Sequence, residues 1–312
     1  MSSSMTGLKP QEFYLLERYG SAEYFEQMHR AWTGMLDVAE QALQAFMLNL
    51  PPDYRNRPAS NQPDIVWGGR VLPNFRGVLG ALDAGLVRIR NGDAHAIGLA
   101  HAVKSAIDAQ AADYATDWMS EDLEKEFWNW QAEAGYRAFN LSITDYAGWT
   151  LGALTIRYHA VRGPLDAPET WPVYALDSAV SVVTGQVIPQ DGVYLPDCID
   201  GAAQFLLKGN EALRARVGYD PQTTHCRARV AAKWTLVRRI SDNGGSRPGL
   251  DEQAATPPAN LRCPAGQSCP RTGYWLTPAE PNSRRTFKQG ETMPELGADY
   301  GATIWQWDVD QP

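Results

Sequence analysis

The sequence lacks the short motifs that mark most nucleotide-binding and hydrolytic enzymes. Its 312 residues contain no glycine-rich phosphate loop, no HExxH and no GxSxG. Histidine is scarce, and His101 lies away from the apolar face of its predicted helix, as a surface histidine would. A pair assembled in three dimensions, such as His225 or Cys226 with Asp197, stays open as an alternative. Since no local pattern supports catalysis, we predict no catalytic residues, no cofactor and no enzymatic activity.

Cysteine is also rare, with four residues: Cys198, Cys226, Cys263 and Cys269. So few thiols in so long a chain exclude a disulfide framework. The interval between Cys263 and Cys269 is not that of a zinc knuckle, although His225 beside Cys226 leaves a metal site as the lesser alternative. We therefore predict free thiols and no bound metal, while the sequence leaves their pairing undecided.

Long apolar runs are missing. The first residues show no apolar core followed by a small-residue cleavage site, so no secretory signal is expected. The most apolar stretch, residues 171–185, is too short to span a bilayer and carries Asp177. The sequence thus favours a cytoplasmic protein without a membrane partner. A formal net charge of −8 disfavours binding to nucleic acid and favours a basic protein partner.

Apolar periodicity is plentiful in the first half of the chain. Apolar residues recur at helical spacing over 21–50, from Asn74 to Gly92, after a cap at Asp93, and from Ser120 to about 139. We predict two further helices at 146–161 and 172–183. Together they form a helical bundle over residues 1–190.

The character of the sequence changes after residue 190. Residues 227–240 alternate like a strand, and a long Gly- and Pro-rich loop follows over 241–270. The last segment, ATIWQWD, places Thr303, Trp305 and Trp307 on one face of a strand. We therefore predict an α+β fold, mainly a helical N-terminal bundle, with residues 191–312 forming a small antiparallel β unit packed on the helices.

One helix carries candidate binding residues. In SEDLEKEFWNWQAEAGYRAF the buried face is predicted to contain Leu123, Phe127, Trp130 and Ala134. Trp128 then points away from that face, with Glu121 and Glu124 as neighbours toward the N-terminus. A tryptophan beside carboxylates suits contact with a basic protein partner, because the ring supplies apolar area and the carboxylates accept bonds from Arg or Lys. The alternative is that Trp128 packs under a neighbouring helix.

Charge is unevenly distributed. Residues 117–133 contain six acidic side chains and one basic, whereas residues 201–250 contain nine basic and three acidic. The basic stretch lacks the interleaved aromatic residues of a ribonucleoprotein motif, so ion pairing with the acidic helices is the simpler interpretation.

Four C-terminal segments resemble a known class of protein. GVYLPD (192–197), KWTLVRRISDNGG (233–245), CPRTGYWLTP (269–278) and RRTFKQGETMPELGADYGATIWQWD (284–308) are similar to the C-terminal sequences of helical immunity proteins encoded beside bacterial polymorphic toxins. These toxins include Rhs toxins delivered by type VI secretion.

The resemblance implies a cytoplasmic, non-enzymatic antitoxin that binds its cognate toxin domain and covers the toxin's active site. The expected toxin is basic and acts on nucleic acids or uses nucleotides. It transfers no contact residues, so Glu121, Glu124 and Trp128 come from the helix pattern alone. A secretion adaptor or chaperone, and an enzyme that reverses a toxin's modification, are the alternatives. We expect the C-terminal tail to stabilise the fold and the helical half to recognise the partner.

Overall fold

The computed structural model describes residues 8–243, 262–277, 283–296 and 303–308. The chain divides into two compact units, Met1–Gly245 and Ser246–Pro312. The predicted α+β class is confirmed, because α-helices occupy the N-terminal half and antiparallel sheets the C-terminal half.

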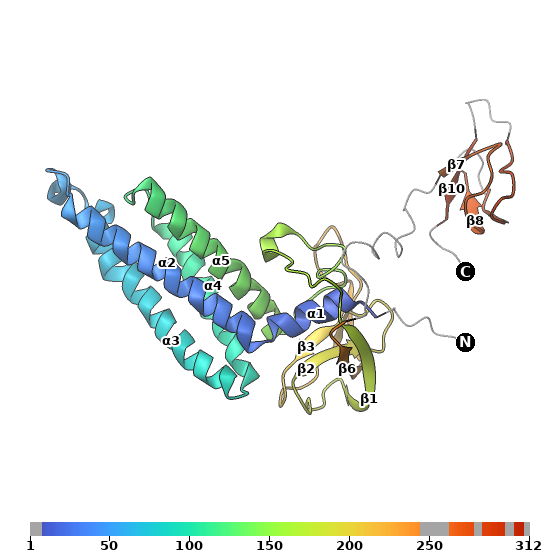
Figure 1. Ribbon diagram of the computed structural model, residues 1–312, viewed down its shortest axis with the longest axis horizontal. Helices are drawn as coiled ribbons and strands as arrows, with labels where there is room; N and C mark the ends of the chain where they lie inside the picture. Colours follow the sequence, from blue (N-terminus) through green and yellow to red (C-terminus); the bar gives the residue numbers. More distant parts are fainter. Residues whose placement is uncertain (1–7, 244–261, 278–282, 297–302, 309–312) are drawn as a thin grey trace. The chain divides into compact units, whose positions relative to one another are not determined.

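Unit 1 begins with helices that pack into an elongated bundle (Figure 1). The α-helices are α1 (Pro10–Tyr19), α2 (Ala22–Leu48), α3 (Leu72–Arg90), α4 (Ala100–Asp113) and α5 (Glu121–Asp145). Helix α2 packs beside α3 and α5, and α4 packs beside α5. Short helical turns η1 (Tyr54–Asn56), η2 (Ala59–Asn61), η3 (Asp64–Val71), η4 (Ala94–Leu99) and η5 (Ala160–Arg162) occupy the connections. No described helix is both long and apolar enough to cross a membrane.

Local sequence explains where these helices start and stop. The Ser21 hydroxyl accepts a hydrogen bond from the backbone N–H of Tyr24 at the start of α2. After α3, Gly92 adopts a φ of 87°, as the predicted left-handed cap requires. Asp93 then accepts from the N–H of His95 and begins η4. The four helices predicted from periodicity are therefore confirmed.

The two remaining predicted helices are wrong. Residues 146–159 form turns, with positive φ angles of 50° at Ala147 and 74° at Gly152, which a helix cannot contain. Residues Val173–Val183 form strand β1 instead of a helix. This segment contains four valines, whose branched side chains favour a strand, and it pairs along β6.

The strands of unit 1 form a sheet against the end of the bundle. Strands β1, β2 (Gly192–Pro196), β3 (Gln204–Leu206) and β6 (Lys233–Ser241) are antiparallel in the order β1-β6-β2-β3. A separate hairpin joins β4 (Ala215–Val217) and β5 (Ala228–Val230). One face of the sheet lies against α1 (Figure 1), and Val193, Phe205 and Val237 join the core of the helices.

Unit 2 contains a second four-stranded antiparallel sheet. Its strands are β7 (Arg262–Pro264), β8 (Gly273–Leu276), β9 (Arg285–Phe287) and β10 (Ile304–Trp307), in the order β7-β10-β8-β9. Thr303, Trp305 and Trp307 are buried together on one face, as predicted. Of the predicted loop over 241–270, residues 244–261 lie outside the described residues, and residues 262–264 form β7.

The division into units differs from the predicted organisation. The predicted boundary lies at 190/191, whereas compactness divides the chain at 245/246. The difference arises because β1 begins at Val173 and pairs with β6, so the first sheet shares the core of the helices.

Two helix glycines provide a matched stability test. A Cβ atom at Gly77 of α3 meets nothing within 4 Å, whereas one at Gly34 of α2 lies 2.8 Å from the Trp130 indole. Gly77→Ala should therefore stabilise unit 1 by about 0.5–1 kcal/mol through helix propensity. Gly34→Ala should lose that gain, because Trp130 must move. Urea unfolding measures both, and equal effects would contradict the close contact between α2 and Trp130.

Candidate functional site

The three predicted binding residues lie within the first two turns of α5. Glu121 is exposed, and Trp128 is 39% exposed with its ring edge-on to Phe127. Glu124 is half-buried, and its Oε1 accepts a hydrogen bond from the Thr116 hydroxyl at 2.6 Å. Helical spacing places all three on one side of α5. The alternative, that Trp128 is buried under a neighbouring helix, does not agree with this exposure.

The predicted buried face of α5 needs one correction. Phe127 and Ala134 are fully buried, but Trp130 is 36% exposed. Trp130 lies at the flank of the buried stripe and rests on Gly34 of α2. The buried position next to Phe127 belongs to Gln131, whose side-chain amide donates to the Gln110 carbonyl oxygen. A polar residue in the stripe is tolerated because this bond satisfies it.

The connection before α5 is fixed by two indoles that share one acceptor. Trp67 of η3 and Trp118 both donate from Nε1 to the carbonyl oxygen of Ala115, at 3.0 and 3.1 Å. Trp67 is buried and edge-on to Trp118, with ring centroids 5.3 Å apart. Trp118 is half-buried and also touches the ring of Phe46. The four-residue stretch 115–118 is thereby held against the end of the bundle where α2 ends and α5 begins, opposite the first sheet (Figure 1).

A groove of about 680 Å³ opens at this end of the bundle. Trp67, Trp118 and Phe46 form its aromatic wall. Exposed Asp113 and Asp117 stand at its edge. The groove's basic side chain, Arg57, is paired with Asp53 at 3.2 Å.

We call this surface the acidic end. It comprises the groove together with the neighbouring first turns of α5, and its exposed or half-exposed members are Asp113, Asp117, Trp118, Glu121, Asp122 and Trp128. Within the described part of the chain, no ion pair neutralises any of its four carboxylates. The groove is not predicted from the sequence. The segment WMSED, which follows Asp117, places a tryptophan between acidic residues and was the local signal for it.

The alternative catalytic pairs are not joined by hydrogen bonds among the described residues. Asp197 accepts from the backbone N–H of Lys233 at 2.9 Å, and no described hydrogen bond joins it to His225 or Cys226. His29 and His101 each contact one carboxylate, of Asp83 and Asp145. These are pairs on the helix surface, and no nucleophile stands beside them in the hydrogen-bond network of the described residues.

The described residues contain no disulfide and no cluster of metal ligands. All four cysteines are free thiols, with Cys263 and Cys269 buried in unit 2. No cluster of three or more His, Cys, Asp or Glu side chains suited to a metal ion occurs in the described ranges. Burial raises the pKa of the Cys263 thiol, which disfavours the thiolate.

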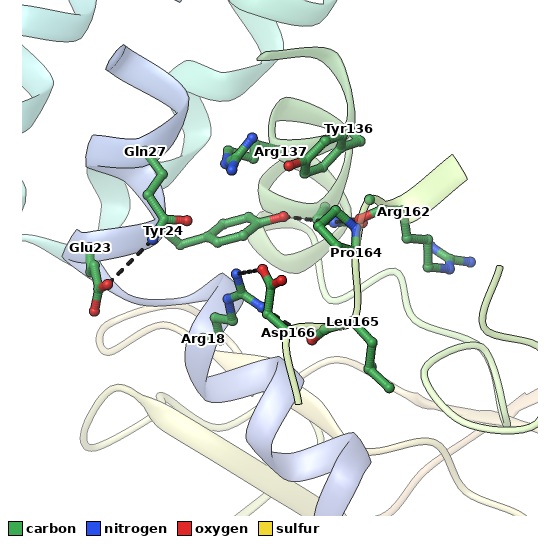
Figure 2. A network of polar contacts seen from close by, with 12 residues as sticks. Arg18, Glu23, Tyr24, Gln27, Tyr136, Arg137, Arg162, Pro164, Leu165 and Asp166 are labelled. Atoms are coloured by element: carbon green, nitrogen blue, oxygen red, sulfur yellow. Dashed lines mark hydrogen bonds and ion pairs between the residues drawn. The ribbon is translucent and has the colours of Figure 1, made fainter. Parts of the chain in front are cut away.

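A second polar cluster lies where α1, α2 and α5 meet (Figure 2). Arg18 pairs with Asp166 at 2.5 Å and donates to the Leu165 carbonyl at 3.2 Å. The Asn140 amide, fully buried, donates to the Tyr24 hydroxyl and to the Arg162 carbonyl, both at 2.9 Å. These bonds fasten residues 162–166 across the helices, so the cluster joins the bundle to the chain that leads into β1.

The basic stretch also has local partners. Arg238 pairs with Asp177 of β1 at 2.5 Å, and Arg239 pairs with Glu17 of α1 at 3.5 Å. We expected the basic stretch to form ion pairs with the acidic helices. Arg239 forms such a pair with Glu17 of α1, whereas no described ion pair involves residues 117–126 of the acidic end.

Comparison with protein-family models, curated proteins and solved structures found no match to this chain.

Proposed function

We propose that this chain is an immunity protein that binds a cognate toxin domain in the cytoplasm of the producing cell and covers the toxin's active site. The acidic end carries the proposal. Four carboxylates without an ion-pair partner in the described residues share this surface with half-buried Trp118 and partly exposed Trp128. The resemblance of the C-terminal segments to immunity proteins supports the same interpretation.

The surface suits a basic protein. Arg or Lys side chains of a toxin would form charge-assisted hydrogen bonds with Asp117 and Glu121 and would stack on the open face of Trp118. Trp128 would supply the apolar area that interface energies depend on. Glu124 has a positioning role, since its bond to Thr116 holds the connection that carries Asp117 and Trp118.

Titration of toxin activity tests the proposed function. The chain is added in increasing amounts to the purified toxin domain encoded by the neighbouring gene. We expect activity to fall to zero at a 1:1 ratio, as occlusion requires. Full rescue at substoichiometric amounts would instead support an enzyme that reverses the toxin's modification. A complex that leaves the toxin active would support a secretion adaptor.

Charge reversal tests the surface. Glu121→Lys should weaken toxin binding roughly 10- to 100-fold, because it removes an attraction and adds a repulsion to a basic partner. The matched control is Glu211→Lys, an exposed glutamate far from the acidic end in sequence, which should bind like the wild type. Calorimetric titration at low salt measures both. Equal loss in the two variants would mean that net charge alone, and not the acidic end, attracts the toxin.

Tryptophan removal tests the apolar part of the same surface. Trp128→Ala should weaken binding by about 2 kcal/mol, the cost typical of an interface tryptophan, with little loss of stability because the ring is partly exposed. The control is Ile156→Ala, which removes a side chain that is 81% exposed on another part of unit 1. Unchanged binding by the Trp128 variant would place the interface elsewhere.

A further inference from the structure

Both β units have the same topology. The first sheet runs β1-β6-β2-β3 and the second β7-β10-β8-β9, and every pairing is antiparallel. Strands β1, β2, β3 and β6 thus correspond to β7, β8, β9 and β10. The connection between the third and fourth of these strands is shorter in unit 2.

The registers of the two sheets coincide. Between β2 and β3, Val193 pairs with Phe205, and between β8 and β9, Tyr274 pairs with Thr286, which is a shift of 81 positions on both strands. The central pairs Tyr194–Leu236 and Trp275–Trp307 correspond likewise, with a shift of 71 on the last strand. Two sheets with the same strand order can still differ in register. The agreement in register is therefore evidence for their relationship that is independent of strand order.

The turns agree as closely as the strands. The N–H of Gly185 bonds to the carbonyl of Ala212, and that of Gly266 bonds to the carbonyl of Met293, each at 2.8 Å. Two isolated bridges, Val187–Glu211 and Ser268–Thr292, occupy the same places. Glycines with a φ of 87° stand in the equivalent turns at 209 and 290.

The two cores match residue by residue. All eight described members of the unit 2 core occupy positions equivalent to members of the core on the first sheet's other face, the face turned away from the helices. The pairs are Val182/Cys263, Ile188/Cys269, Tyr194/Trp275, Leu206/Phe287, Ala212/Met293, Ala215/Leu296, Trp234/Trp305 and Leu236/Trp307.

The hydrogen bonds made by core side chains are also equivalent in the two units. Trp234 and Trp305 each donate from Nε1 at 2.9 Å, to the carbonyls of Leu213 and Pro294. The Tyr194 hydroxyl and the Trp275 indole donate to the equivalent carbonyls of Gln190 and Arg271.

The opposite faces of the two sheets differ in character. In unit 1 this face is apolar and joins the core of the helices through Val193, Ala203, Phe205 and Val237. The equivalent residues in unit 2 are Tyr274, Arg284, Thr286 and Asp308. Arg284 pairs with Asp308 and lies over the Tyr274 ring at 4.2 Å. Because its side chains form polar contacts with one another, this face does not depend on burial against an apolar surface.

We infer that residues 182–236 and 263–307 are two copies of one β module, and that the second copy is a self-contained domain. The first copy uses one face to hold the helices, and the second copy replaces that apolar face by a polar one. A small unit then completes its fold around its own core, in which three tryptophans pack with Phe287, Met293 and two cysteines, instead of borrowing a core from the bundle.

Matched tryptophan variants of the full chain test the independence of the copies. In near-UV circular dichroism and calorimetry, Trp305→Ala should abolish the thermal transition of unit 2 and leave that of unit 1 in place. Trp234→Ala removes the equivalent indole from the first copy and should lower only the transition of unit 1. If either variant abolished the structure of both units, the second copy would not be self-contained.

A conservative exchange tests the equivalence of the copies. Trp275→Tyr installs the residue that the first copy has at this position, so it should keep the hydrogen bond to the Arg271 carbonyl. Trp275→Phe cannot donate that bond. We expect the midpoint of unit 2 to be about 5 °C higher in the tyrosine variant than in the phenylalanine variant. Equal midpoints, or a lower midpoint for the tyrosine variant, would overturn the assignment of Tyr194 and Trp275 as equivalent residues.

Discussion

Trp67→Ala should lower the free energy of unfolding of unit 1 by about 3–5 kcal/mol, the cost of removing a buried indole. The ring is 1% exposed and is edge-on to Trp118, Phe75 and Phe127. Its N–H also satisfies the carbonyl of Ala115. The substitution therefore leaves a cavity where η3, the connection before α5 and α5 itself converge, and chemical denaturation measures the loss.

The same substitution should also abolish binding to the proposed toxin partner, because Trp67 lines the groove and its indole bond to Ala115 fixes the stretch that presents Asp117 and Trp118. Trp67→Phe separates the two effects. It retains the apolar ring but not the hydrogen bond, so we expect a smaller loss of about 1–3 kcal/mol. Trp118→Ala is the complementary variant, which should lose binding with less loss of stability, since Trp118 is half-buried. A stable Trp67→Ala protein with normal affinity would remove the groove from the proposed interface.

Periodicity predicts the bundle well, because each of α2, α3, α4 and α5 places one apolar stripe against its neighbours. The prediction fails where tertiary pairing decides. Residues 172–183 show apolar spacing compatible with either a helix or a strand, and their partner β6 lies about fifty residues later in the chain. Ala147 with its positive φ shows that the preceding turns owe their conformation to packing, which no local propensity encodes.

The candidate surface was predicted in part. Helical spacing correctly places Glu121 and Trp128 on an exposed side of α5, because both depend only on the local helix. The groove depends on Trp67 reaching across to Ala115, and no pattern in one segment contains that contact. Trp130 illustrates the same limit, since its position against Gly34 depends on a contact between two helices.

The sequence itself contains a signal of the duplicated module. Residues 185–195 and 266–276 share the pattern GQxxPxxGxxL, with both glycines that the turns require. Beyond this segment most core positions differ in identity, since Leu206 corresponds to Phe287 and Ala212 to Met293, although Trp234 and Trp305 are the same residue. At positions where the residues differ, the equivalence of the two modules is seen in strand register and hydrogen bonds.

Glu12→Gln should make unit 1 more stable at pH 8 by about 3 kcal/mol and leave it almost unchanged at pH 4. Glu12 lies on α1, is 4% exposed and belongs to the junction between the helices and the first sheet. Burial raises the pKa of its carboxyl from 4.5 to about 7, although the charge of Lys9 and a hydrogen bond from the Ala203 backbone oppose the shift. The folded protein therefore holds this proton more tightly than the unfolded chain.

The sign of the pH effect follows from that difference. Below pH 4.5 both states are protonated, and the contribution of Glu12 to stability is complete. Between pH 4.5 and about 7 the unfolded chain releases the proton while the folded state retains it, so the wild type loses stability as pH rises. Above pH 7 both states are ionised and the loss is constant. Glutamine has no proton to release, so the variant should lack this slope.

Urea unfolding of both proteins from pH 4 to pH 8.5 measures the effect, and the difference between them isolates Glu12 from other titrating groups. Glu17 is the necessary control, because burial also raises its pKa while the Tyr174 hydroxyl and Arg239 lower it. Glu17→Gln should retain the steep component between pH 4.5 and 7 that Glu12 supplies. If the Glu12 variant differed from the wild type by the same free energy at every pH, the carboxyl would have the same pKa in the folded and unfolded states, and the junction between α1 and the sheet would be solvated.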